Sequence, residues 1–219
     1  PAMRGAFGAK LVEQARERLQ RAHTRARQLR QPMAQMAAIW HDALFEVRLR
    51  NPQRVAALAD EMKVLADKFA LAHGLYGSRW FRGWADSHMG QPLEGYRSIR
   101  EAYEENARLG MLVGGSETRA YAAEALLLAG DWDAASDQLE EALQFANVRR
   151  ERVYLSQLFL MQAAIARARG EGAAAHAAAR QQLVHGHTVE PGRLGSARHV
   201  AVEPRQQAAQ IATVEPLDH

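Results

Sequence analysis

The chain has 219 residues, of which 43 are Ala, 16 Gly, 7 Pro and none Cys. The lack of Cys excludes a disulfide scaffold, a Cys-ligated zinc or iron–sulfur site and a thiol nucleophile. An apolar fraction of 47% with 24% charged residues is typical of a globular protein, and no run approaches the roughly 18 apolar residues that a membrane span needs. Because Ala loses no side-chain entropy on entering a helix, we expect an all-α protein. We also expect a cytoplasmic location.

The first predicted helix, residues 8–29, carries most of the positive charge. Residues 1–50 hold 10 Lys or Arg against 4 acids, although the net charge of the chain is only +3. Its arginines recur every two to four residues and so surround the helix: Arg16, Arg18, Arg21, Arg25, Arg27 and Arg30. This pattern favours a solvated terminal helix, with contact to nucleic acid or an acidic partner as the alternative.

The chain opens Pro1-Ala2-Met3, with no initiator Met and no signal-like apolar segment before the first helix. We therefore expect it to be a piece of a longer protein.

A regular repeat organises the middle of the chain. Gly90, Gly130 and Gly170 recur with a period of about 40 residues, and each separates two apolar-periodic runs. A Gly that ends a helix can adopt the left-handed conformation at little steric cost, and Pro92 or Asp131 after it suits the start of the next helix. The residues five positions after these glycines are small, which would let the paired helices pack closely: Gly95, Ala135 and Ala175.

The breaks between apolar-periodic runs predict the helices. They lie at about 8–29, 33–50, 53–72, 76–89, 93–109, 117–129, 132–147, 152–169 and 173–183. Asn51, in the left-handed position, and Ala56 form an earlier, degenerate copy of the glycine break. The one long loop follows residue 109, and Ser116 is the expected N-cap of the next helix.

Stacked helix pairs of this kind bury a face only against their neighbours, and they form a solenoid with a concave and a convex side. The pattern is carried by Gly83, Gly90, Gly95, Ala102, Ala123, Gly130, Trp132, Ala135, Ala142, Phe159, Ala163, Gly170 and Ala175. Over about residues 10–183 the chain resembles tetratricopeptide repeats (TPRs). The resemblance implies a right-handed superhelical stack of antiparallel helix pairs, here with a period of about 40 residues.

A narrower resemblance rests on Arg82-Gly83-Trp84-Ala85, on the break that begins at Gly90 and on residues 120–126. These segments look like the long repeats that follow the ATPase module of large bacterial regulators. Such regulators join class III nucleotide-cyclase or DNA-binding domains to a signal-transduction ATPase. The resemblance implies a signalling or transcription-regulation context.

In TPR solenoids the first helix of each pair lines the concave groove, where peptides or neighbouring segments bind. The resemblance implies a partner-binding groove formed by Trp40, Phe45, Trp80, Trp84, His88, Glu124, Leu127 and Arg167. Trp80 and Trp84 are four residues apart and share one helix face, so they would anchor a partner. The alternative for this pair is packing in the core or between repeats.

No catalytic motif is found in the sequence. It contains no Walker-type phosphate loop, no dinucleotide fingerprint and no His-Glu-x-x-His. The pairs Glu104–Glu105 and Glu140–Glu141 fit solvated faces of amphipathic helices, and His185 with His187 lacks a supporting carboxylate. We expect no enzymatic activity, catalytic residue, metal or cofactor. A helical enzyme with unrecognised chemistry is the remaining alternative.

The helical period ends near residue 184. Val-Glu-Pro recurs at 189–191, 202–204 and 214–216, and proline at these intervals prevents a continuous helix. We expect a repeat domain at 1–183, with about four helix pairs plus an N-terminal helix, and a tail at 184–219. The tail is expected to be disordered, or docked in the groove of its own or a neighbouring copy.

Two functions fit these expectations. The first is an interaction and sensing module of a larger bacterial signalling or transcription regulator, which binds a peptide, a partner protein or an adjacent domain. The second is a stand-alone adaptor for protein assembly or secretion. In either case we expect a protein or peptide ligand, self-association through the tail, and neither a membrane nor a nucleic-acid partner.

Overall fold

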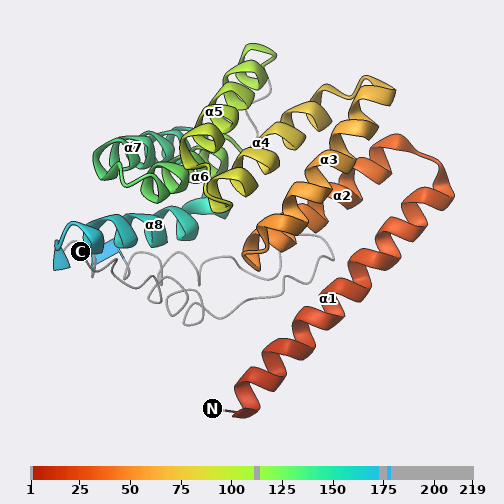
Figure 1. Ribbon diagram of the computed structural model, residues 1–219, viewed down its shortest axis with the longest axis horizontal. Helices are drawn as coiled ribbons and strands as arrows, with labels where there is room; N and C mark the ends of the chain where they lie inside the picture. Colours follow the sequence, from red (N-terminus) through yellow and green to blue (C-terminus); the bar gives the residue numbers. More distant parts are fainter. Residues whose placement is uncertain (1, 111–113, 173–176, 179–219) are drawn as a thin grey trace. The chain divides into compact units, whose positions relative to one another are not determined.

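The computed structural model describes residues 2–110, 114–172 and 177–178, and all regular secondary structure in these residues is helical (Figure 1). The expected all-α class is confirmed. The helices are α1 (Ala2–Leu29), α2 (Pro32–Arg48), α3 (Pro52–Phe69), α4 (Ala72–His88), α5 (Pro92–Arg108), α6 (Gly115–Leu128), α7 (Trp132–Arg149), the 3-10 turn η1 (Arg152–Tyr154) and α8 (Leu155–Ala168). The helix predicted at 173–183 lies almost wholly outside the described residues, and so does the tail.

The turns between consecutive helices contain residues in the left-handed conformation. Gly90, Gly130 and Gly170 have φ angles of 94°, 79° and 76°, as predicted. The same conformation occurs in the other turns, at Arg30, Arg50, Ala70, Gly110 and Arg150. A left-handed residue therefore recurs every 20 residues from position 30 to position 170, and Gly114 before α6 is an additional one. The sequence has glycine at only half of the regularly spaced positions.

Two expectations about helix ends are wrong. The left-handed residue before α3 is Arg50, with a φ of 56°, whereas Asn51 caps the helix. The Asn51 side chain accepts a hydrogen bond from the Arg54 backbone N–H at 3.3 Å, which satisfies one of the free donors of the first turn. The N-cap of α6 is Gly114, and Ser116 lies inside the helix with no exposed surface. The Ser116 hydroxyl instead donates to the Glu151 carboxylate at 2.5 Å.

The chain divides into two compact units, residues 1–112 and 113–219. In the first unit α1 to α5 pack in chain order, and α4 lies between α3 and α5 (Figure 1). In the second unit α6 packs against both α7 and α8, and α7 also contacts α8.

The α4 and α5 helices approach so closely that their contact requires glycine. A Cβ on Gly95 would lie 2.2 Å from the Gly83 carbonyl oxygen and 2.0 Å from the Ser87 Oγ. In the second unit Ala135, at the equivalent position of α7, is fully buried. The predicted close packing is thus confirmed at Gly95 and Ala135. Ala56, its expected counterpart in α3, is only half-buried.

The two cores differ in composition. The largest buried side chains of the first unit are aromatic, methionine and branched aliphatic: Leu58, Met62, Trp80, Phe81, Trp84 and Ile99. The second unit buries mainly alanine and leucine, with one large ring: Ala120, Tyr121, Ala123, Ala135, Leu139, Ala142 and Leu158.

Candidate functional site

The eight predicted groove residues divide between the two units. Five belong to the first unit, on α2 and α4: Trp40, Phe45, Trp80, Trp84 and His88. The other three belong to the second unit, on α6 and α8: Glu124, Leu127 and Arg167.

Trp80 and Trp84 are core residues, with exposures of 2% and 1%. The Trp80 ring centroid lies 4.1 Å from that of Phe81 and 5.6 Å from that of Trp40. The groove interpretation of this pair is therefore corrected in favour of packing, because buried rings offer no surface to a partner. Helical spacing placed the two rings on one face but did not show that this face is covered.

His88, at the end of α4, is half-buried against Trp84. The two ring centroids are 4.2 Å apart. Arg50, from the turn before α3, reaches the same place: its guanidinium lies 6.0 Å from the Trp84 ring centroid and its Nη1 is 3.4 Å from the His88 Nε2. His88 thus joins α4 to the α2–α3 turn.

The outer face of α2 is the exposed part of the predicted groove in the first unit. We call it the α2 strip, and it consists of Met33, Ala37, Trp40, His41, Leu44, Phe45 and Arg48. Met33 is 59% exposed, His41 and Arg48 are exposed, and Trp40 and Phe45 are half-buried. These positions recur at helical spacing and leave the opposite face of α2 for the core.

Neighbouring helices flank the α2 strip on both sides. On one side the Trp40 ring stacks on His73 of α4, with centroids 4.5 Å apart and planes at 14°. On the other side the Arg16 guanidinium of α1 lies 5.9 Å from the Phe45 ring centroid. Partial burial lowers the pKa of His73, so burial favours the neutral ring in this stack. The strip is therefore an apolar and aromatic surface with basic groups at its edges.

In the second unit, the predicted residues are more accessible than the tryptophans. Glu124 and Leu127 are half-buried on α6, Arg167 is exposed on α8, and Leu128 is 48% exposed. Glu117, at the start of α6, is buried instead, and its carboxylate accepts a hydrogen bond from the Tyr121 hydroxyl at 3.4 Å.

The sequence did not reveal two buried acids that fix α2 to its neighbours. Glu46 is 1% exposed, forms an ion pair with Arg16 of α1 at 3.0 Å and accepts a hydrogen bond from the Asn51 amide at 2.9 Å. Asp42, one turn earlier, lies 3.2 Å from His23 and 3.1 Å from Arg54. The sequence shows that Asp42 and Glu46 are four residues apart and share a helix face, but it does not show whether that face is buried or solvated.

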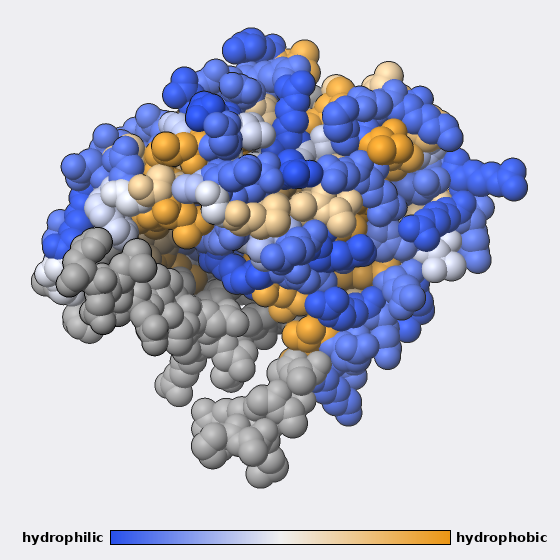
Figure 2. All heavy atoms as spheres, in the orientation of Figure 1, coloured by the Kyte–Doolittle hydropathy of each residue, from blue (hydrophilic) through white to orange (hydrophobic). Residues whose placement is uncertain are grey.

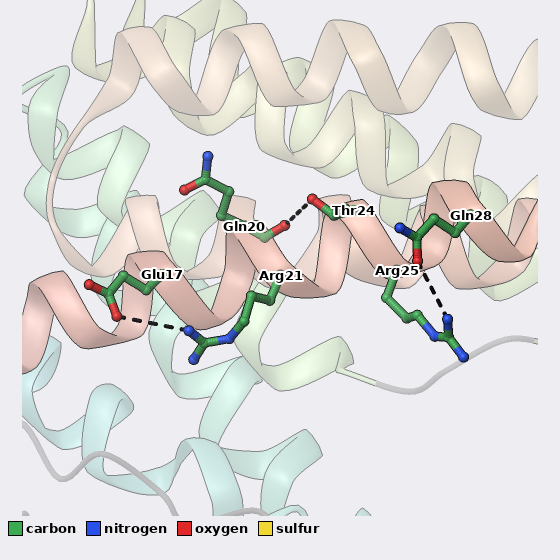
Figure 3. Close-up of a pocket in the computed structure, with 6 residues that line it drawn as sticks. All are labelled: Glu17, Gln20, Arg21, Thr24, Arg25 and Gln28. Carbon is green, nitrogen blue, oxygen red and sulfur yellow. Dashed lines mark hydrogen bonds and ion pairs between the residues drawn. The ribbon is translucent and has the colours of Figure 1, made fainter.

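The arginines of α1 fall into two groups, those that face the neighbouring helices and those on the outer face of α1. Arg16 and Arg27 face α2 and α3, where they meet Glu46 and Glu61. On the outer face the side chains of Glu17, Gln20, Arg21, Thr24, Arg25 and Gln28 line a hollow of about 500 Å³ (Figure 3). The interactions drawn there run along α1 itself, such as the 3.9 Å pair between Arg21 and Glu17. On the face drawn in Figure 2, hydrophilic residues predominate and smaller apolar patches lie between them.

The described residues contain neither a metal-binding cluster nor a membrane-spanning helix. Within 2–110, 114–172 and 177–178 no three His, Asp or Glu side chains gather in a way that could hold a metal ion. No helix in the same residues combines the length and the apolar character of a membrane span. Comparison with family models, with curated proteins and with solved structures finds no match for this chain.

Proposed function

We propose that the chain is a TPR-like interaction module that binds a peptide, a partner protein or an adjacent domain along the α2 strip. Its expected context is a larger bacterial signalling or transcription regulator. The observation that carries the proposal is the exposure of Met33 and the partial exposure of Trp40 and Phe45 on a single helix face. Met, aromatic residues and Arg are enriched in protein interfaces, where they dominate the binding free energy.

The regular backbone supports the repeat part of this proposal. Left-handed residues at a constant interval separate helices α2 to α8, which are 14 to 18 residues long, and consecutive helices pack on each other within each unit. In such an arrangement each helix pair presents an outer face of the same kind.

The composition of the α2 strip points to an amphipathic ligand. The strip offers the Met33 side chain and part of the Trp40 ring for apolar contact, and Arg48 lies at its C-terminal end. A matching ligand segment would place apolar side chains against Met33 and Trp40 and an acidic side chain against Arg48.

Affinity capture with a matched pair of variants tests the proposal. The tagged full chain is used to capture proteins from a bacterial lysate, beside a Met33→Glu/His41→Glu variant. The control is Val64→Glu on α3, where the side chain is 70% exposed on a different face. We expect a captured protein that is lost with the α2 variant and retained with the control. Equal capture by both variants would show that the α2 strip is not the binding surface.

A further inference from the structure

The outer face of α1 carries unbalanced positive charge. Arg16 and Arg27 are neutralised by Glu46 and Glu61 on the side that meets α2 and α3. Among the other α1 side chains whose burial is described, four cations are exposed, Lys10, Arg18, Arg21 and Arg25, against the exposed carboxylates of Glu13 and Glu17. Of these two carboxylates, only Glu17 approaches one of the four cations, at 3.9 Å from Arg21. Arg18, Arg21 and Arg25 follow the spacing i, i+3, i+7 and therefore share one face of the helix. Arg25 also contacts Gln28, at 3.4 Å.

The outer face of α7 carries the opposite charge. Asp133, Asp137, Glu140 and Glu141 are exposed at the spacing i, i+4, i+7, i+8, and α7 contains no Lys or Arg before Arg149. The core face of the helix, with Ala135, Leu139, Ala142 and Ala146, lies on the opposite side.

Neighbouring groups neutralise only part of the charge on α7. Asp133 pairs with Arg169, yet its side chain is 93% exposed. The Glu140 and Glu141 carboxylates accept hydrogen bonds from the neutral amides of Gln144 and Gln138, at 3.3 and 2.9 Å.

The spacings of the two charged faces match when the helices run antiparallel. From Arg25 to Arg21 to Arg18 the steps are four and three residues, and from Asp133 to Asp137 to Glu140 they are again four and three. At a rise of about 1.5 Å per residue, the charges are separated by about 6 Å and then about 4.5 Å on both helices. Three cations can therefore lie opposite three carboxylates in a single register.

We propose that α1 of one copy of this chain docks antiparallel along α7 of a second copy, so that copies associate head to tail. We choose a second copy as the partner because the acidic outer face of its α7 complements the basic outer face of α1. After one such contact the first copy keeps a free α7 face and the second copy a free α1 face. The contact is therefore heterologous and builds rings or open chains. This surface is separate from the α2 strip, so the inference can fail while the proposed function stands, and the reverse also holds.

Contacts between exposed charges are individually weak and are screened by salt. The mean mass in solution should therefore rise with protein concentration at an ionic strength of about 0.01 M, where the screening length is about 30 Å. It should return to that of the monomer at about 1 M, where the screening length is about 3 Å. Sedimentation of the full chain measures both.

Charge reversal identifies the two faces. In this register Arg18 lies opposite Glu140 and Arg21 opposite Asp137. Arg18→Glu/Arg21→Glu therefore places acidic groups opposite acidic groups, and Asp137→Arg/Glu140→Arg places basic groups opposite basic groups. We expect each variant alone to stay monomeric at low salt. An equimolar mixture should associate again, because the two reversed positions on α1 of the first variant lie opposite the two reversed positions on α7 of the second, while Arg25 still faces Asp133. The control is Arg97→Glu/Arg100→Glu on α5, which changes the net charge by the same amount and should associate like the wild type.

Three outcomes would overturn the inference. These are a wild-type chain that is monomeric at low salt, reversal variants that associate as the wild type does, and a mixture that fails to associate although helical circular dichroism shows both variants to be folded. The last outcome would assign the loss to total charge or to another surface.

Discussion

The α4–α5 pair and the α6–α7 pair follow the same plan but fill their interfaces differently. Both turn at a left-handed glycine, Gly90 or Gly130, and both have a small residue five positions later. In the first pair this residue is Gly95, against which the Gly83 backbone packs, and tryptophans fill the surrounding core. In the second pair it is Ala135, within a core that is mostly alanine. The interface between the paired helices is thus filled by large rings and a backbone contact in the first unit, and by alanine methyl groups in the second.

The aromatic core should make the first unit the more sensitive to truncation. Trp80→Ala removes a ring that is 2% exposed, and we expect a loss of about 4 kcal/mol in the free energy of unfolding of that unit. Leu139→Ala, in the second unit, should cost about 3 kcal/mol. Hydrogen exchange followed by mass spectrometry would locate each loss. Equal loss of protection in both units after Trp80→Ala would mean that the units do not unfold separately.

The glycine contact gives the sharpest contrast between the two pairs. Gly95→Ala forces a methyl group against the Gly83 carbonyl, which is backbone and cannot rotate away, so we expect a loss of about 3 kcal/mol. The reverse change, Ala135→Gly, should cost only about 1 kcal/mol through helix propensity and a small cavity. Urea unfolding measures both. A Gly95→Ala variant as stable as the wild type would place α4 and α5 farther apart.

The buried acid of α2 links the N-terminal helix to the rest of the first unit. Glu46→Ala should cost about 2 kcal/mol, because the Asn51 amide loses its acceptor and Arg16 loses its partner. Glu61→Ala, which removes the exposed partner of Arg27, should cost less than about 0.5 kcal/mol. Thermal unfolding of the two variants compares these values, and similar losses would mean that α1 is held by its exposed pairs.

Two substitutions in the turns should change the free energy of unfolding by smaller amounts and in opposite directions. Ala70 is exposed and left-handed, with a φ of 53°, so Ala70→Gly should stabilise the first unit by about 1 kcal/mol. Gly130→Ala imposes the same strain on the second unit and should destabilise it by about 1 kcal/mol. Chemical denaturation gives both values. A loss of stability in Ala70→Gly would contradict the left-handed assignment.

The smallest expected effect is a pH dependence in the stability of the first unit, where His73 lies. The pKa of His73 is lowered by burial, so the unfolded chain binds more protons than the folded chain near its ordinary pKa of about 6.5. This contribution to stability is present above that pH and is lost as the pH falls through it toward the folded value. His73→Gln should reduce the acid sensitivity of the urea midpoint, and an unchanged pH profile would assign that sensitivity to other groups.

The sequence predicted the helices well because apolar periodicity and glycine breaks are local signals. It did not predict the left-handed conformation of Arg30, Arg50, Ala70 and Arg150, because glycine is the main sequence signal for that conformation. At residues other than glycine the conformation is strained, and packing elsewhere must offset the strain. The predicted site was less accurate for a related reason. Periodicity groups Trp80 with Trp84, but only the positions of other helices show that these rings are covered while Met33 is not. Sorting the arginines of α1 likewise requires the positions of Glu46 and Glu61.

The most direct test of the proposed binding surface is site-specific crosslinking. A photoreactive amino acid is placed at His41, in the centre of the α2 strip, and in a separate variant at Val64 on α3. After irradiation of bacterial cells that express the full chain, we predict a distinct crosslinked protein from position 41 that is absent from position 64. The same products from both positions, or none from position 41, would contradict a partner-binding role for this face.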